Sequence, residues 1–232
     1  MQQSLNKTQK APSTAMSPTT AGLDTGDRRR NDSREKLKQA AIELFFEHGF
    51  EATSIRQIVS ACDLSPPAFY NHFDTKDDLL REIIHEGHVQ AEEMMNLALE
   101  GAGVSPTERL RELIAAYVRF HTHHQLQALV VNSEFRCLKK THLSDTLAER
   151  IRLRGLIQGV IEEGVSAGHF DLAGKANAAN AIRMATIAIG DMSLRVASWF
   201  DEKGELEREE VEAFYADFAL RLVGAQRAGT SS

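Results

Sequence analysis

Cysteine and proline are scarce in this chain, which has two cysteines and five prolines in 232 residues. The cysteines, Cys62 and Cys137, are too few for the disulfide framework of a small secreted protein, and we expect both to be reduced and buried. No apolar run reaches the ~18 residues that a membrane-spanning helix needs, and the N-terminus lacks the apolar core of a signal peptide. These absences predict a cytoplasmic protein with no membrane partner.

A strong excess of positive charge is also missing. The formal net charge is −6, from 27 Lys and Arg against 33 Asp and Glu. Residues 77–232 carry 17 basic and 24 acidic side chains, whereas residues 28–76 carry eight and seven. A uniformly basic nucleic-acid binder is therefore excluded, and a small module that contacts a limited set of phosphates, attached to an acidic body, remains.

Signatures of common enzyme classes are absent as well. There is no glycine-rich phosphate loop, no G-x-S-x-G and no H-E-x-x-H, so we predict neither an enzyme nor a cofactor. His121, His123, His124 and His142 are close enough in sequence to suggest a transition-metal site. No Cys or Asp joins them at ligand spacing, so exposed or pocket-lining histidines are the favoured interpretation and no metal is predicted.

Residues 53–76 carry the strongest local pattern. Thr53 is placed to cap a helix with an apolar stripe. Asp63 tolerates the left-handed backbone of a turn, and Ser65 followed by Pro66 begins a second, short helix. Two helices joined by a tight turn form a helix-turn-helix, which places its second helix in the DNA major groove.

The segment Ser65–Leu80, SPPAFYNHFDTKDDLL, resembles the recognition helix and following turn of TetR-family transcriptional regulators. The resemblance covers about residues 34–85 and departs from the family at Asp63, where many members have glycine. It implies an all-α fold. An N-terminal three-helix helix-turn-helix domain is expected, followed by a C-terminal helical domain for ligand binding and dimerisation.

Contacts to DNA are assigned within this module by residue type. Arg56 offers a fork of donors to guanine or to phosphate. Tyr70, His72 and Lys76 suit phosphate oxygens, Lys76 because it lies at a helix N-terminus. The residues that lead the second helix offer a hydroxyl and apolar surface to base edges: Ser65, Pro66, Pro67 and Ala68.

The first 32 residues are rich in Thr, Ser, Gln, Pro and Asn, and we predict that they are disordered. They contain Arg28, Arg29 and Arg30, just before a first helix expected at about Ser33. This cluster is either a solvated charge run or an arm that follows the DNA backbone or enters the minor groove.

The DNA-binding domain is assigned to residues 33–80, and the effector-binding and dimerisation domain to residues 81–226. The latter is expected to be helical throughout, because no alternating apolar pattern indicates a strand. Its last two helices are the predicted dimer surface, unless these faces pack only within the chain. The predicted stripes are Ala178, Ala181, Ile182, Ala185, Ile189 and Met192 on one helix and Phe214, Phe218 and Leu222 on the other.

Arginines lie among apolar residues in the middle of the chain, which indicates either a charged outer face or a pocket for a ligand with an apolar body and an anionic head. The C-terminal part is similar to a subgroup that includes acyl-CoA-responsive regulators of lipid and sterol catabolism, which favours the pocket. Candidates for the head are Arg136 and Arg154. Candidates for the body are Phe135, Met184 and Trp199.

The resemblance as a whole implies a ligand-responsive repressor that binds a palindromic operator as a homodimer. Its expected partners are double-stranded DNA, a second copy of the chain and a small hydrophobic or acyl-CoA-like effector. An activator of the same fold, and a helical protein whose helix-turn-helix is only structural, remain the alternatives.

Overall fold

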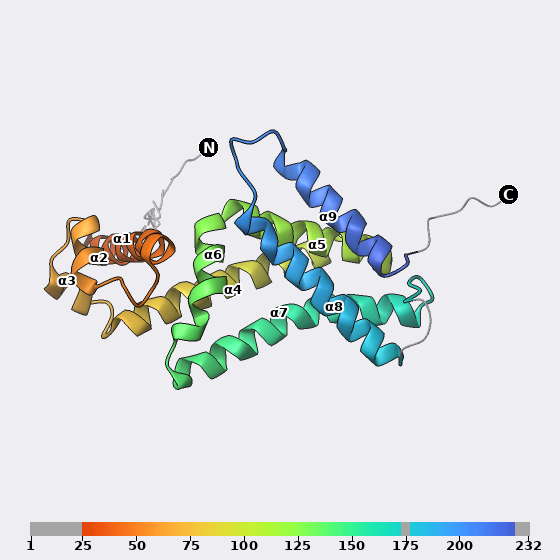
Figure 1. Cartoon of the computed structure of the whole chain (residues 1–232), viewed down its shortest axis with the longest axis horizontal. Coiled ribbons are helices and arrows are strands. Elements are labelled where there is room, and N and C mark those ends of the chain that lie inside the picture. The colour runs from red at the N-terminus through yellow and green to blue at the C-terminus, as the bar shows by residue number, and fades with distance from the viewer. Residues whose placement is uncertain (1–24, 173–176, 226–232) are drawn as a thin grey trace, which may run out of the picture.

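The computed structural model describes residues 25–172 and 177–225, which form an arrangement of helices (Figure 1). The helices are α1 (Thr25–His48), α2 (Ile55–Ala61), α3 (Pro66–Tyr70), α4 (Lys76–Gly101), α5 (Pro106–His123), α6 (Gln125–Glu134), η1 (Phe135–Cys137), α7 (Lys140–Ser166), α8 (Ala178–Leu194), η2 (Arg195–Ser198) and α9 (Arg208–Leu222). No strand occurs in this part of the chain, where Phe170 and Ala225 form an isolated bridge. The prediction of an all-α fold is confirmed.

The first helix begins earlier than the sequence pattern indicated. α1 starts at Thr25, so the prediction of disorder is wrong for residues 25–32, and residues 1–24 lie outside the described part. Ser33 is inside the helix, and its hydroxyl donates to the carbonyl oxygen of Arg29 at 3.0 Å. An ion pair of 2.8 Å between Lys36 and Asp32 adds helical i,i+4 support that the composition of the tail obscured.

Helix α2 is capped one residue later than expected. Ser54 Oγ accepts the Gln57 N–H at 3.2 Å, and Gln57 Oε1 accepts the Ser54 N–H at 2.8 Å, which completes a capping box. Thr53, the predicted cap, is buried instead and donates its hydroxyl to the carbonyl oxygen of Gly49 at 2.9 Å. Asp63 has a φ of 53°, the left-handed turn conformation that was predicted.

The hydrophobic core of the helix-turn-helix extends beyond its own helices. Phe45, Phe69 and Leu80 belong to it, and each is at most 1% exposed. The later helix α6 and the residues that follow it contribute to the same core: Val130, Val131 and Leu138. The DNA-binding module is therefore packed against α6 as well as against α4 (Figure 1).

Two ion pairs hold α1 on α4 outside this core. Arg34 pairs with Glu82, and the Lys38 ammonium lies 2.7 Å from a carboxylate oxygen of Glu86. Lys38 is only 6% exposed, so its charge depends on Glu86 and on Glu35, whose carboxylate also lies 2.7 Å away. The two pairs fix the direction in which the helix-turn-helix leaves the long helix.

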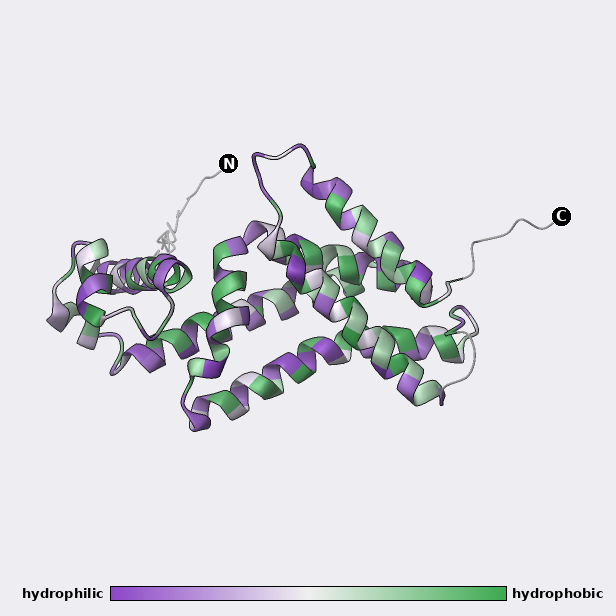
Figure 2. Ribbon diagram, in the orientation of Figure 1, coloured by the Kyte–Doolittle hydropathy of each residue, from purple (hydrophilic) through white to green (hydrophobic). Residues whose placement is uncertain are grey.

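Helix α5 lies at the centre of the C-terminal half, where it contacts α4, α7, α8 and α9. Its residues Leu110, Leu113, Ile114 and Val118 are fully enclosed. Figure 2 shows hydrophilic and hydrophobic residues interleaved along α7, as expected of a helix with one face inward and one in solvent. Among the described helices, none combines the length and the apolar character that crossing a bilayer requires.

Candidate DNA interface and interior cavity

The recognition helix α3 is anchored by one face and exposes the other. Phe69 is fully enclosed, and its ring centroid lies 5.7 Å from that of Phe73. Pro66 is the first residue of the helix, as predicted, although the hydroxyl of Ser65 makes no capping hydrogen bond. The residues predicted for base edges lie at the exposed start of this helix, with Ser65, Pro66 and Pro67 exposed and Ala68 half-buried.

Arg56 and Tyr70 have polar groups available for an external partner. Arg56, near the start of α2, is exposed and forms no ion pair or hydrogen bond with the residues that the structure describes. Tyr70 is 57% exposed, and its ring packs edge-on against Phe69 at 5.5 Å. Because the aromatic body is fixed and the hydroxyl makes no hydrogen bond within the described part of the chain, Tyr70 suits a phosphate contact that orients the helix.

His72 lies between the recognition helix and the arginines of α1. Burial lowers its pKa, and the nearby charges of Arg30 and Arg34 lower it further. A neutral ring keeps one N–H for a phosphate oxygen. Arg30 also donates to the carbonyl oxygen of Asn71 at 3.3 Å, so the basic cluster lies on a helix beside the end of α3 and not on an extended arm. Arg28 and Arg29, on the same helix, are exposed.

Lys76 differs from its predicted role. Its ammonium donates to the carbonyl oxygens of Phe50 at 2.5 Å and Thr53 at 2.6 Å, and it lies 4.2 Å from the centroid of the Phe50 ring. These contacts close the loop between α1 and α2 onto the start of α4. The charge predicted to meet a phosphate is thus occupied within the chain, which sequence position alone did not reveal.

The C-terminal half contains a cavity bounded by α4, α5, α6, α7 and α8, which opens to solvent beside the exposed residues Arg154 and Asp191. The cavity has a volume of about 40 Å³, which is room for roughly three water molecules. Its apolar wall comes from Gly87, Ala91, Phe120, Ala128, Val131, Leu153, Ile157, Gly190 and Leu194. Its polar lining comes from His88, Tyr117, His121, Asn132, Arg150, Arg154 and Asp191.

Of the five residues predicted to bind an effector, only Arg154 lines this cavity. Arg136 is exposed and lies 5.6 Å from the ring of Phe135, outside the cavity. Met184 and Trp199 are 58% and 45% exposed. Their apolar character indicated a pocket, but the rotation of α8 and the course of the chain after η2 turn them outward.

Arg150 is the main residue that the sequence prediction missed. It lies one helical turn from Arg154, donates to the side-chain oxygen of Asn132 at 3.2 Å, and stacks 4.5 Å over the ring of Phe135. Burial lowers the pKa of Arg150. Arg152 pairs with Glu92, whereas Arg150 and Arg154 have no carboxylate partner in the described ranges. The i,i+4 spacing of the two arginines was the signal that could have identified them together.

Glu149 ties α7 to α4 beside the cavity. One carboxylate oxygen accepts from Nδ1 of His85 at 2.6 Å, and the other accepts from Nδ1 of His88 at 2.8 Å. Burial tends to raise the pKa of Glu149, but the two hydrogen bonds outweigh burial and lower it. The charged carboxylate therefore connects the long helix that carries the helix-turn-helix to the helix that carries the arginines.

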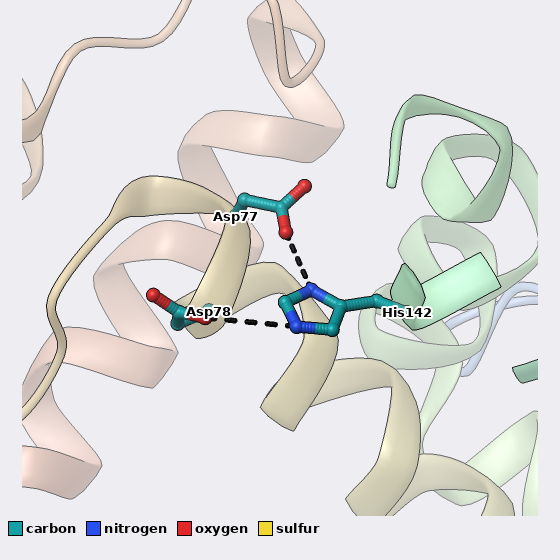
Figure 3. Close-up of side chains that lie close together, drawn as sticks. All are labelled: Asp77, Asp78 and His142. Atoms are coloured by element: carbon teal, nitrogen blue, oxygen red, sulfur yellow. Dashed lines mark hydrogen bonds and ion pairs between the residues drawn. The ribbon is translucent and has the colours of Figure 1, made fainter. Parts of the chain in front are cut away.

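A second tie lies at the opposite end of this contact, where Asp77, Asp78 and His142 point toward one another (Figure 3). His142 Nδ1 lies 2.5 Å from Asp77, and Nε2 lies 3.9 Å from Asp78. The other Asp77 oxygen accepts the Lys139 N–H, and Asp78 accepts the Thr75 hydroxyl. Because both carboxylates are already bonded, we interpret this trio as a link between α4 and α7 and not as a metal site.

The predicted dimer stripe is only partly available on the surface. Ala185 and Ile189 are 4% and 0% exposed, because they pack into the chain's own core, so their assignment to the dimer surface is corrected. On α9, Phe214 and Phe218 are 64% and 45% exposed, with their rings stacked at 6.4 Å. The helical period of α8 does not show which face points inward, because that depends on how α8 packs against α5 and α7.

Comparison with known proteins agrees with this architecture. Residues 103–223, more than half of the chain, match the family described as "Tetracyclin repressor-like, C-terminal domain". Residues 37–83 match "Bacterial regulatory proteins, tetR family". The chain belongs to the TetR family. As a TetR-family protein it is a regulator and not an enzyme.

Individual relatives place this TetR-family chain among regulators from several bacteria. The repressor KstR2 of Mycolicibacterium smegmatis is 24% identical over 190 residues, which is 81% of this chain and 88% of KstR2. The regulator YerO of Bacillus subtilis is 33% identical over 103 residues, 44% of this chain, but the match spans only 36% of YerO.

Two solved structures show the same fold. A tetR-family protein from Rhodococcus RHA1 has a TM-score of 0.76 and 30% identity, and the match covers 84% of this chain and 98% of that protein. AibR, solved with isovaleryl coenzyme A and operator DNA, has a TM-score of 0.69 and 20% identity, and the match covers 84% of this chain and all of AibR.

Proposed function

We propose that this TetR-family protein is a homodimeric repressor in the cytoplasm. It binds a palindromic operator through α3 and releases it when a small effector enters the interior cavity. The observation that carries the proposal is the exposed recognition helix, which is held by the buried Phe69. The Tyr70 hydroxyl and the nearby Arg56 guanidinium have no hydrogen-bond or ion-pair partner in the described chain. A helix-turn-helix with only a structural role would not need free donors on one module.

The DNA-binding half is tested by selecting bound sequences from a random duplex pool. We expect a palindrome whose affinity falls steeply as salt rises. Tyr70→Phe should weaken binding to all sequences similarly, whereas Arg56→Ala should also relax the preference at one position of each half-site. Equal affinity of the wild type for the selected palindrome and for a scrambled duplex would contradict the proposal.

The dimer is supported by the exposed aromatic residues of α9. We expect Phe214→Glu combined with Phe218→Glu to give a folded monomer that no longer binds the palindrome, because one half-site alone is too weak. The matched control is Leu97→Glu, since Leu97 is 66% exposed and belongs to α4. Light scattering at micromolar concentration distinguishes the two. A double variant that stays dimeric would show that this face is not the interface.

The effector is proposed to have an apolar body and an anionic head, such as an acyl-CoA or a related organic acid. Arg154 and Arg150 are the proposed head-group ligands, because neither is already neutralised by a carboxylate within the described chain. AibR provides a precedent for an acyl-CoA ligand in this fold. Since the cavity has room for only a few waters, ligand entry must widen it, which couples binding to movement of the helices around it.

Gly190 gives a direct test of the cavity. The nearest heavy atom to an added Cβ is Ile157 Cδ1 at 3.9 Å, so alanine fits, whereas leucine would occupy the cavity. We expect isovaleryl-CoA to release DNA from the wild type and Gly190→Ala but not from Gly190→Leu. Coenzyme A alone serves as the head-group control. A tenfold loss of operator affinity needs about 1.4 kcal/mol of coupling. Unchanged release in Gly190→Leu would exclude this cavity as the site.

A further inference from the structure

Two histidines of the cavity are held in the same tautomer. His88 Nδ1 lies 2.8 Å from a carboxylate oxygen of Glu149, and His121 Nδ1 lies 2.8 Å from the carbonyl oxygen of Tyr117. A carboxylate and a carbonyl can only accept, so each Nδ1 carries the proton and donates it. In a neutral ring the Nε2 atom is then left as an acceptor with a free lone pair.

Burial favours the neutral form of both rings. His88 is 5% exposed and His121 is 3% exposed. Burial lowers the pKa of His88 in spite of its hydrogen bond to Glu149. Burial, assisted by the charge of Arg150, lowers the pKa of His121 to about 4. Each ring therefore presents an acceptor and not a second donor.

Neither Nε2 atom has a hydrogen-bond partner among the described residues. Neither belongs to the fully enclosed side-chain atoms that lack a hydrogen-bond partner, which in the described ranges are Gln90 Oε1 and Arg109 Nε. Each Nε2 therefore keeps some accessible surface. Because His88 and His121 both line the cavity, we place that surface on the cavity side.

The remaining polar groups make the cavity two-sided. Arg150 and Arg154 supply positive donors, Asp191 is a nearby negative group, and the Tyr117 hydroxyl and the Asn132 amide complete the polar lining. A ligand that carried only an anionic group would satisfy the arginines but leave the two imidazole acceptors without a hydrogen when it displaced water. Unpaired polar groups in a dry site are costly, so the cavity discriminates against such a ligand.

We propose that the cavity selects a small organic acid that also carries a hydroxyl or N–H group, with its anion at Arg150 and Arg154 and its donor at Nε2 of His88 and His121. The proposal rests on the effector role proposed for this cavity and names the chemical class of the ligand. A metal ion is a weaker candidate. A structural or catalytic zinc needs at least three protein ligands, and the one converging trio in the described chain is at Asp77.

Calorimetry with matched aromatic acids tests the proposal. The probes are benzoate, 3- and 4-hydroxybenzoate, and the corresponding methoxybenzoates, which keep the oxygen and lose the donor. We expect at least one hydroxybenzoate to bind wild-type protein about tenfold more tightly than its methyl ether and than benzoate. In His121→Phe, which removes the acceptor while its former carbonyl partner stays within a helix, the preference should fall to less than about twofold.

Nitrogen-detected tautomer measurements provide a second test that does not depend on the ligand or on a variant. Long-range ¹H–¹⁵N spectra of the wild type at neutral pH should show protonated Nδ1 and unprotonated Nε2 for His88 and His121. The opposite tautomer, or a charged ring, would overturn the proposal.

The outcomes also separate this proposal from the proposed function. Equal binding of hydroxy and methoxy acids, with operator release intact, would overturn the donor requirement and leave the effector cavity standing. Absence of binding by every acid would overturn the ligand class. Operator binding in the same preparation would then show that the DNA-binding half is unaffected.

Discussion

Replacement of Lys76 separates a role in loop closure from a role in phosphate binding. In Lys76→Ala, the carbonyl oxygens of Phe50 and Thr53 lose a charged donor at 2.5 and 2.6 Å, and the Phe50 ring loses a cation at 4.2 Å. Hydrogen bonds to charged groups contribute about 1.5–3 kcal/mol each, but these carbonyls can be rehydrated in a half-buried loop. We therefore expect the free energy of unfolding to fall by about 2–3 kcal/mol in total.

The assay is urea and thermal unfolding beside operator titrations at several salt concentrations. For a chain of this size, the expected loss corresponds to a decrease in Tm of roughly 5–10 °C. The matched control is Arg56→Ala, whose exposed side chain has no partner in the described chain, so its stability should stay within about 0.5 kcal/mol of the wild type.

Salt dependence then reports on phosphate contacts. Each contact contributes about 0.9 to the slope of log affinity against log salt, so a phosphate contact by Lys76 in both half-sites would be worth about 1.8. Because the Lys76 ammonium of the wild type is bound to carbonyl oxygens, Lys76→Ala should leave this slope unchanged at a temperature where the variant is folded. A Lys76→Ala variant that keeps the stability of the wild type but has a salt-dependence slope reduced by nearly two would refute this reasoning.

Two further predictions concern stability. Gly164→Ala should destabilise the chain by about 2 kcal/mol or more, because an added Cβ would lie 2.1 Å from the Phe170 ring, whereas Gly159→Ala has nothing within 4 Å and should stabilise it by about 0.5–1 kcal/mol in urea unfolding. The pKa of about 4 for His121 predicts acid lability, since the unfolded ring takes up its proton below about pH 6.5 and the folded ring only below about 4. As the pH is lowered between those values, the contribution of His121 to the unfolding free energy should therefore fall by about 1.4 kcal/mol per pH unit. His121→Phe should lack that part of the slope of unfolding free energy against pH. Identical slopes in the two proteins would contradict a buried neutral ring.

The helical architecture was predictable because its signals are local and repeated. The turn at Asp63 and the proline start of α3 depend on backbone preferences of single residues, and both were correctly predicted. The N-cap was wrong by one residue because Thr53 and Ser54 have similar intrinsic preferences. Burial of Thr53 under α1, a tertiary effect, decides between them.

The candidate sites were harder to predict, because they depend on how helices rotate about their axes. The sequence indicates that α8 is apolar but not that Ile189 points inward while Met184 points outward. Likewise, the chain from Arg150 to Arg154 places two arginines on one helical face, but only the packing of α7 against α4 and α5 turns that face into a cavity. Lys76 illustrates the same limit, since its carbonyl partners are more than twenty residues away in sequence.

The participation of α6 in the core of the helix-turn-helix has a consequence for the exchange of parts between regulators. Val130, Val131 and Leu138 fill space beside the residues that support the recognition helix, and Glu134 accepts the backbone N–H of Phe50 at 3.2 Å. A hybrid that joins residues 1–80 of this chain to the C-terminal domain of another regulator would pack an unmatched α6 against the helix-turn-helix and leave a void in its core. The helix-turn-helix and α6 therefore form one packing unit in this chain, and a working graft must carry residues 125–138 along with the helix-turn-helix.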